Sequence, residues 1–177
     1  SRELEHYHSE GYVYPHRVMS EQEAAGFADA FCSYEERAKG PLESSYNHKL
    51  HLVAGWAADL VHHPAILDAV EDILGPDLLC WTTNLLVKDA GDERYVSWHQ
   101  DLNYWGLDTD ELVTVWLALD DSQEENGAVC FYRGSHHLGL QHRQRALLTV
   151  ARVVVTASPH LARSQPVLAR LQLLDQI

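Results

Sequence analysis

The sequence has few cysteines and no long apolar run. Its three cysteines, Cys32, Cys80 and Cys130, are widely spaced and form no Cys-x-x-Cys pair, which disfavours a disulfide framework and a cysteine zinc site. We therefore expect a reducing, cytoplasmic location. No stretch approaches the roughly 18 apolar residues of a membrane span, and the first residues form no apolar signal segment, so we expect no membrane partner.

Positive charge is scarce as well. Lys and Arg total 13 against 26 Asp and Glu, for a formal net charge of -13. A protein that binds nucleic-acid phosphates needs clustered positive charge, so we expect no nucleic-acid partner. With 46% hydrophobic residues among 177, the chain can bury the core of a globular domain. Histidine, in contrast, is abundant: 12 residues, a number that directs attention to metal chemistry.

Two helices are predicted in the first half of the chain. Ser20 and Glu23 form a capping-box pattern, and apolar residues follow at helical spacing, so a helix should begin there and end before residue 40. Residues 64–74 begin with proline, place their apolar residues on one side and are followed by Gly75. This start and stop pattern predicts a second helix.

Patterns typical of β-strands dominate the rest of the chain. Runs rich in β-branched, aromatic or alternating apolar residues predict strands at 11–14, 45–53, 78–88, 112–119 and 128–132. Asn126 and Gly127 form a turn dipeptide between the last two. Helices followed by a run of strands indicate an α+β chain, mainly β, whose core is a sandwich or barrel.

Trp98-His99-Gln100-Asp101 is the candidate metal motif. On an extended chain residues two apart point to the same face, so we expect His99 and Asp101 to project into one space. An imidazole and a carboxylate supply two ligands of the two-histidine-one-carboxylate triad, which leaves positions open on Fe(II). Such a pair also arises readily by chance, and a surface His–Asp pair is the plain alternative.

The surrounding sequence favours the metal interpretation. It contains, in order, WHQD at 98–101, VWLALDD at 115–121 and ENGAVCFYRGSHH at 125–137. Together these segments resemble the phytanoyl-CoA dioxygenase family of iron- and 2-oxoglutarate-dependent oxygenases. The resemblance covers roughly residues 5–143.

The resemblance implies a fold and a reaction. The family fold is a double-stranded β-helix, a jelly-roll of eight strands with the metal inside its mouth, here preceded by helices. The implied cofactors are Fe(II) and the cosubstrate 2-oxoglutarate, and the implied partners are dioxygen and a small-molecule substrate. The expected reaction is hydroxylation of a C–H bond, coupled to oxidation of 2-oxoglutarate.

The resemblance also implies site residues. His99 and Asp101 match the iron ligands, and Trp116 matches a tryptophan that lines the cosubstrate pocket. Lys88 and Asn84 stand where polar residues of the family face the site. The Gly-Ser-His element within the third segment is a structural signature of the family, so its histidines are not assigned to the metal.

The distal part of the family pattern is not recognisable. The family carries its second histidine in an H-x-S/G-x-x-N-x-S stretch, followed by an arginine that binds 2-oxoglutarate. His160 is the single histidine beyond His142 and is therefore the candidate third ligand. Arg163 has the wrong strand parity relative to it, whereas Arg170 has the right parity, although Pro166 lies between. We thus expect a jelly-roll that is incomplete at its C-terminal end.

Residues 141–177 differ in composition from the rest of the chain. They hold five arginines, no lysine and one acid, Asp175, with no glycine after Gly139 and no aromatic residue after Tyr132. Two interpretations stay open: a basic helical or disordered end, or a segment foreign to the fold. The predicted division is an oxygenase-like domain, 1–140, and an atypical tail.

Three functions remain open from the sequence. The leading hypothesis is an Fe(II)- and 2-oxoglutarate-dependent dioxygenase that hydroxylates a small organic substrate. The alternative is a truncated or inactive family member with an incomplete metal site, acting at most as a binding module. A cupin-like metal protein without 2-oxoglutarate would also explain His99 and Asp101, but not the other two family segments.

Overall fold

The computed structural model describes residues 1–38, 48–89, 91, 95–140 and 167–176. The helices and strands of this part are as follows: α1 (Arg2–Glu10), α2 (Glu21–Arg37), α3 (Gly55–Val61), α4 (Pro64–Leu74), β1 (Leu79–Asp89), α5 (Leu102–Trp105), β2 (Leu112–Ala118) and β3 (Val167–Gln176). Three short 3-10 helices are interspersed: η2 (Leu50–Leu52), η3 (Glu124–Asn126) and η4 (Ser135–Leu138).

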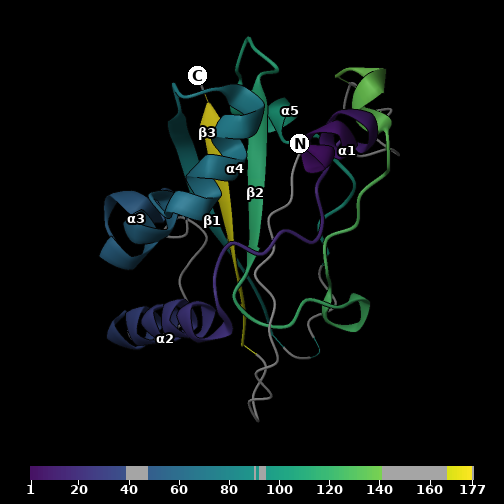
Figure 1. Cartoon of the computed structure of the whole chain (residues 1–177). Coiled ribbons are helices and arrows are strands. Elements are labelled where there is room, and N and C mark those ends of the chain that lie inside the picture. Colours follow the sequence, from purple (N-terminus) through teal and green to yellow (C-terminus); the bar gives the residue numbers. More distant parts are fainter. Residues whose placement is uncertain (39–47, 90, 92–94, 141–166, 177) are drawn as a thin grey trace.

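The strands form an antiparallel sheet in the order β1-β3-β2 (Figure 1). Strand β3 lies in the middle, so Gln172 pairs with Asn84 of β1 on one side and with Trp116 of β2 on the other. Residues 167–176 are therefore extended, and the helical interpretation of the tail is wrong for them. The first two strands were predicted within one residue at each end.

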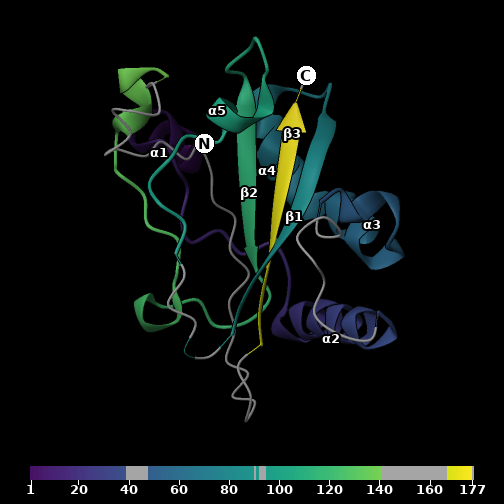
Figure 2. The same cartoon turned by 180° about the vertical axis from the view of Figure 1, so that it is seen from behind.

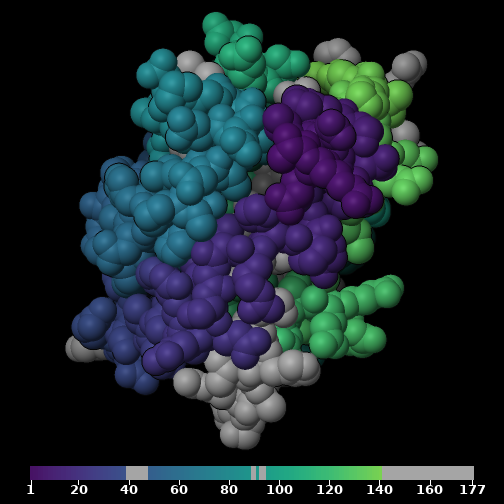
Figure 3. Space-filling view, in the orientation of Figure 1, coloured from purple at the N-terminus to yellow at the C-terminus, as the bar shows by residue number. Residues whose placement is uncertain are grey.

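The two faces of the sheet differ in what covers them. Figures 1 and 2 show α4 on one face and α5 on the other. Side chains alternate along β2. Val113 and Val115 point to the α4 face, where they line a cavity of about 60 Å³ together with Val70 of α4 and Tyr7 of α1. The helices α1 and α4 adjoin on this face (Figure 3).

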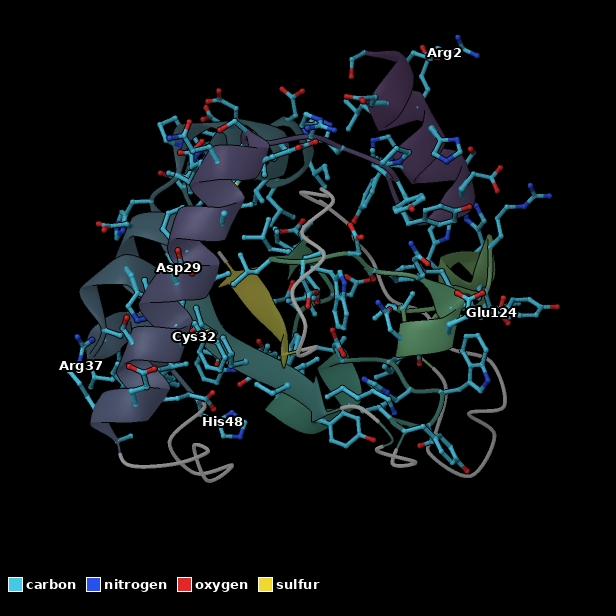
Figure 4. The ribbon with its side chains drawn as sticks, turned by 90° about the horizontal axis from the view of Figure 1, so that it is seen from below. Arg2, Asp29, Cys32, Arg37, His48 and Glu124 are labelled. Atoms are coloured by element: carbon cyan, nitrogen blue, oxygen red, sulfur yellow. The ribbon has the colours of Figure 1, made fainter. Side chains whose placement is uncertain are left out.

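The hydrophobic core lies between the sheet and the helices. Its largest side chains with almost no exposed surface come from four helical elements, from β2 and from the residue directly after it: Phe31, Leu50, Leu60, Ile66, Leu117 and Leu119. In Figure 4, α2, marked by Asp29 and Arg37, and the segment with Glu124 lie at opposite sides of the molecule. Leu117 and Leu119 follow Val113 and Val115 at every second position, so these core residues lie on the α4 face of the sheet.

Both predicted helices are confirmed. The Ser20 hydroxyl accepts the Glu23 N–H at 3.2 Å and caps α2. Helix α4 spans Pro64–Leu74 and ends at Gly75, whose φ of 89° is accessible to glycine. A helix that was not predicted, α1, is capped in the same way by Ser1, whose side chain accepts the Leu4 N–H.

Two of the predicted strands, 11–14 and 128–132, are not formed. The first follows directly on α1, and the second connects η3 to η4. The two segments meet through side chains instead of a backbone ladder, because the rings of Tyr12 and Phe131 stack with their centres 5.5 Å apart. The apolar residues of these two ranges therefore serve a contact between side chains and not a β-ladder.

The predicted strand at 45–53 is also wrong within its described part, 48–53. His48 forms an isolated bridge to Asn84. Lys49 then has a left-handed backbone with φ 55°, which turns the chain into η2. The apolar Leu50 is buried by this turn and not by a strand.

The expected combination of helices with a sheet is confirmed, although helices contribute more residues than strands within the described ranges. The described ranges contain the strands β1, β2 and β3, fewer than the eight strands of a jelly-roll, and that finer architecture stays a prediction. No helix in the described part is long and apolar enough to cross a membrane.

Candidate metal site before helix α5

The predicted metal motif lies in a loop and not on a strand. Residues 95–100 have no helix or strand, and Asp101 has helical backbone angles at the start of α5. The expectation that an extended chain aligns the two side chains is therefore wrong. They meet nevertheless, because the loop turns: His99 Nε2 lies 3.0 Å from Asp101 Oδ1.

His99 is held by both of its ring nitrogens. Nδ1 lies 2.7 Å from the carbonyl oxygen of Ser97, to which it can only donate, while Nε2 faces Asp101. The hydrogen bond to Asp101 raises the pKa of His99. Partial burial opposes this, and the Ser97 carbonyl and the charge of Asp101 raise the pKa further. The metal-free pair thus favours the protonated ring.

Asp101 is held through its second oxygen as well. The Thr114 hydroxyl of β2 donates to Asp101 Oδ2 at 2.7 Å. Thr114 is buried, and the Asp101 side chain is 13% exposed. The carboxylate therefore directs Oδ1 toward His99 and Oδ2 toward the sheet.

A second tether holds the motif loop from another direction. The Gln100 side chain is buried, and its Nε2 donates to the carbonyl oxygen of Gly139 at 3.0 Å. This hydrogen bond connects the motif to the segment after η4.

A cavity of about 100 Å³ lies beside Asp101 on the face of the sheet that carries Thr114. Its walls combine apolar and polar groups: Gln100, Asp101, Leu102, Asp110, Leu112, Thr114, His136, Gly139 and Leu140. The Asp101 carboxylate is thus accessible to a small molecule in this cavity.

The predicted cofactor residues share that face but do not line the cavity. Trp116 follows Thr114 by two residues on β2 and is buried. Asn84 lies in the same row of the sheet, through Gln172, and Lys88 is four residues further along β1. The Asn84 Oδ1 is buried and has no hydrogen-bond partner among the described residues.

The remaining predicted site residues are not brought to the pair. His160 and Arg163 lie outside the described residues. Arg170 belongs to β3, where its backbone pairs with Leu86 and Ala118. Within the described ranges no three His, Cys, Asp or Glu side chains gather as a metal site.

The donors that are present fit two ligands of one metal ion. Two ligands at neighbouring corners of an octahedral ion, with bonds of about 2.1 Å, are about 3 Å apart, and the two atoms here are 3.0 Å apart. A ligating histidine usually gives its other ring N–H to a carbonyl or carboxylate, as His99 does to Ser97.

Thr114 is a site residue that the motif did not reveal. A signal was available: it is a polar residue inside the apolar run LVTVWLAL, and a buried hydroxyl in such a strand requires a partner.

The comparisons with known proteins identify the family of the chain. The family model described as phytanoyl-CoA dioxygenase (PhyH) matches residues 7–150, which is most of the chain. The chain belongs to the phytanoyl-CoA dioxygenase family. The resemblance expected from the sequence is therefore confirmed. The motif 98–101 lies within the matched range, whereas His160 and Arg170 lie beyond it.

The curated relatives of this chain include a proline hydroxylase and an ectoine dioxygenase. The L-proline trans-4-hydroxylase of Streptomyces griseoviridis is 29% identical over 117 residues, 61% of this chain and 44% of that protein. The ectoine dioxygenase of Streptomyces avermitilis is 27% identical over 92 residues, 50% of this chain and 31% of that protein. The chain thus spans less than half the length of these relatives.

Two solved structures superpose on most of the chain. A non-heme monooxygenase, the ThoJ–Ni complex, has a TM-score of 0.76 and 32% identity, covering 97% of this chain and 76% of that one. CytC3 with Fe(II) and alpha-ketoglutarate has a TM-score of 0.60 at 16% identity, covering 98% of this chain and 75% of that one, and supports the fold alone.

Proposed function

We propose that this chain carries the metal-binding part of an Fe(II)- and 2-oxoglutarate-dependent dioxygenase that hydroxylates a small organic substrate. The observation that carries the proposal is the convergence of His99 Nε2 and Asp101 Oδ1 beside a cavity. Membership of the family and the hydroxylase and dioxygenase relatives support it. The expected compartment is the cytoplasm.

The residues of this chain have distinct tasks in the proposed reaction. His99 and Asp101 bind the metal, with His160 proposed as the third ligand. When bound together, iron and 2-oxoglutarate supply the oxidation of a C–H bond by dioxygen. The buried side chain of Trp116 is proposed to exclude water from the cosubstrate side.

Three polar residues are proposed to receive 2-oxoglutarate. The Asn84 side-chain NH2 group can donate to a carboxylate oxygen of 2-oxoglutarate, while its buried Oδ1 accepts from a neighbouring hydroxyl or water. Lys88, on the same face of β1, and Arg170, in the neighbouring strand β3, supply positive charge for a carboxylate. We also propose that the whole protein closes its sheets into the jelly-roll of the family.

An anaerobic titration tests the metal assignment. Fe(II) and 2-oxoglutarate are added to the native protein and to the His99→Ala and Asp101→Ala variants, and the weak visible charge-transfer band of the bound pair is recorded. The band is expected in the native protein and is expected to be lost in both variants, because each removes one ligand. His6→Ala, at an exposed histidine of α1, is the control and should keep the band. A native protein without the band would refute the assignment.

One observation favours a second candidate, an incomplete family member that binds without turnover. No third metal-ligating side chain joins the pair within the described residues. If this candidate is right, the protein binds metal weakly and forms no succinate with any substrate. Reading the coding DNA around codons 140–145 separates the two, because a one-base shift that restores an H-x-S/G-x-x-N-x-S stretch would indicate an intact oxygenase.

A further inference from the structure

Thr114 is a buried hydroxyl in a strand whose seven residues are all buried. It is 6% exposed, and a hydroxyl removed from water without a hydrogen bond destabilises the folded state. Its partner is the second oxygen of Asp101, at 2.7 Å. The length is that of a charge-assisted O–H···O⁻ bond, which is stronger than a bond between neutral groups.

The position of the motif makes this hydrogen bond important. Because His99 and Asp101 lie in a loop and not on a strand, the regular ladder of a sheet does not hold them. The hydrogen bond from His99 to Ser97 is local and leaves the loop free to move as a unit. Thr114, in contrast, connects a proposed ligand directly to a buried strand.

The hydrogen bond also decides which oxygen of Asp101 can bind a metal. With Oδ2 occupied by the Thr114 hydroxyl, Oδ1 is directed at the ligating atom of His99. Without it, Oδ2 loses its hydrogen bond to the sheet, and the two donor atoms keep the separation that an octahedral ion requires less firmly. Groups that orient a ligand in this way often change metal affinity by 10- to 100-fold.

We propose that Thr114 is a positioning residue for the metal site: its hydroxyl fixes the Asp101 carboxylate in the orientation that binds the metal. The inference rests on the proposed function and deepens it by adding a residue that acts through a ligand. Gln100 holds the same loop from its other side, so the loop keeps its approximate place when the hydroxyl is removed.

The test compares two substitutions of different chemistry at this position. Thr114→Val keeps the shape and the preference for a strand but removes the hydroxyl, whereas Thr114→Ser keeps the hydroxyl. The affinity for Ni(II), used as a redox-inert probe, is measured by calorimetry. We expect Thr114→Val to raise the dissociation constant for Ni(II) by about 10- to 100-fold. The dissociation constant of Thr114→Ser should stay within about threefold of the native value.

A matched control uses another buried threonine of the sheet. Thr83 is fully buried on β1, its residue alternates to the opposite face, and its hydroxyl bonds to His51. Thr83→Val should leave Ni(II) affinity unchanged. Equal losses in Thr114→Val and Thr83→Val, equal losses in Thr114→Val and Thr114→Ser, or no loss in Thr114→Val would each overturn the proposal.

A second readout needs no metal. Amide hydrogen exchange of residues 98–102 in the metal-free protein should be faster in Thr114→Val than in the native protein, and unchanged in Thr83→Val. If the native protein does not bind Ni(II), the proposed function is wrong. The exchange rates then still decide whether Thr114 holds the loop, and unchanged rates would refute that.

Discussion

At the scale of single residues, neighbours move the proton affinity of two histidines in opposite directions. The hydrogen bond that His99 donates to Asp101 raises the pKa of His99 despite partial burial. Burial lowers the pKa of His51, and the nearby charges of Lys49 and His62 lower it further. Environment therefore assigns different tasks to chemically identical side chains, which a count of histidines cannot reveal.

The lowered pKa of His51 predicts a loss of stability in acid. The folded protein binds a proton at His51 less readily than the unfolded chain, whose value is about 6.5. The free energy of unfolding should therefore be unaffected by His51 well above pH 6.5 and decrease as the pH falls through that value. The decrease ends below the pKa of the folded state.

Urea unfolding of the native protein and of His51→Asn between pH 8 and pH 5 measures this effect. The asparagine amide oxygen can replace Nδ1 as the partner of the Thr83 hydroxyl, 3.0 Å away, but it does not titrate. The native protein should lose more stability toward acid than the variant does. His48→Asn serves as the control at an exposed histidine, and parallel curves for native protein and His51→Asn would contradict the prediction.

At the scale of elements, the segment 133–137 binds the C-terminal end of α1. The last carbonyl groups of a helix have no partner within it, and they interact favourably with donors and positive charge. Here the donors come from more than a hundred residues away: Gly134 N to Glu10 O at 2.8 Å, His136 Nε2 to His8 O at 2.9 Å, and His137 Nε2 to Ser9 O at 3.2 Å. The two histidines thus have a structural task.

Gly11 allows this contact, and its substitution should disturb it. Gly11 ends α1 with φ 87°, and a Cβ there would lie 2.5 Å from His136 Nδ1. We expect Gly11→Ala to lower the free energy of unfolding by about 1–3 kcal/mol, because the alanine is strained and the imidazole must move.

Gly26→Ala is the matched control for this prediction. Gly26 lies inside α2, and a Cβ there meets nothing within 4 Å. This variant should gain up to about 1 kcal/mol of stability, since alanine favours the helix. Denaturant unfolding measures both variants. A Gly11→Ala protein as stable as the native one would show that His136 does not pack against the helix end.

Elements differ in how far the sequence predicts them. Helices α2 and α4 depend on local start and stop signals, Ser20 for α2 and Pro64 with Gly75 for α4, and both are predicted by the sequence. Strands depend on partners elsewhere in the chain. The apolar ranges 11–14 and 128–132 therefore looked like strands but contact each other through side chains alone.

At the scale of the whole molecule, β3 joins parts of the chain that are far apart. Strands β1 and β2 each pair with β3. Removing β3 would leave both without their ladder and expose unpaired backbone groups. The division of the chain after residue 140, made from composition, is still a prediction, and it conflicts with this dependence.

A shortened chain decides between the two views. We expect residues 1–140 alone to lose the cooperative urea transition of the full chain, followed by near-ultraviolet circular dichroism. Leu171→Pro, in the middle of β3, should lower the free energy of unfolding of the full chain by about 3 kcal/mol or more, because proline cannot donate a backbone hydrogen bond to the neighbouring strand. A 1–140 chain that unfolds cooperatively at the native midpoint would instead support a self-sufficient domain.

The sequence by itself determined the family, the helices α2 and α4, and the identity of the His99–Asp101 pair. Each of these depends on short segments whose residues are close together in the sequence. The tertiary structure alone decided that the pair lies in a loop, that Thr114 holds its carboxylate, and that 167–176 pairs between β1 and β2. These features join residues distant in sequence, and which of many possible partners meet is settled when the whole chain packs.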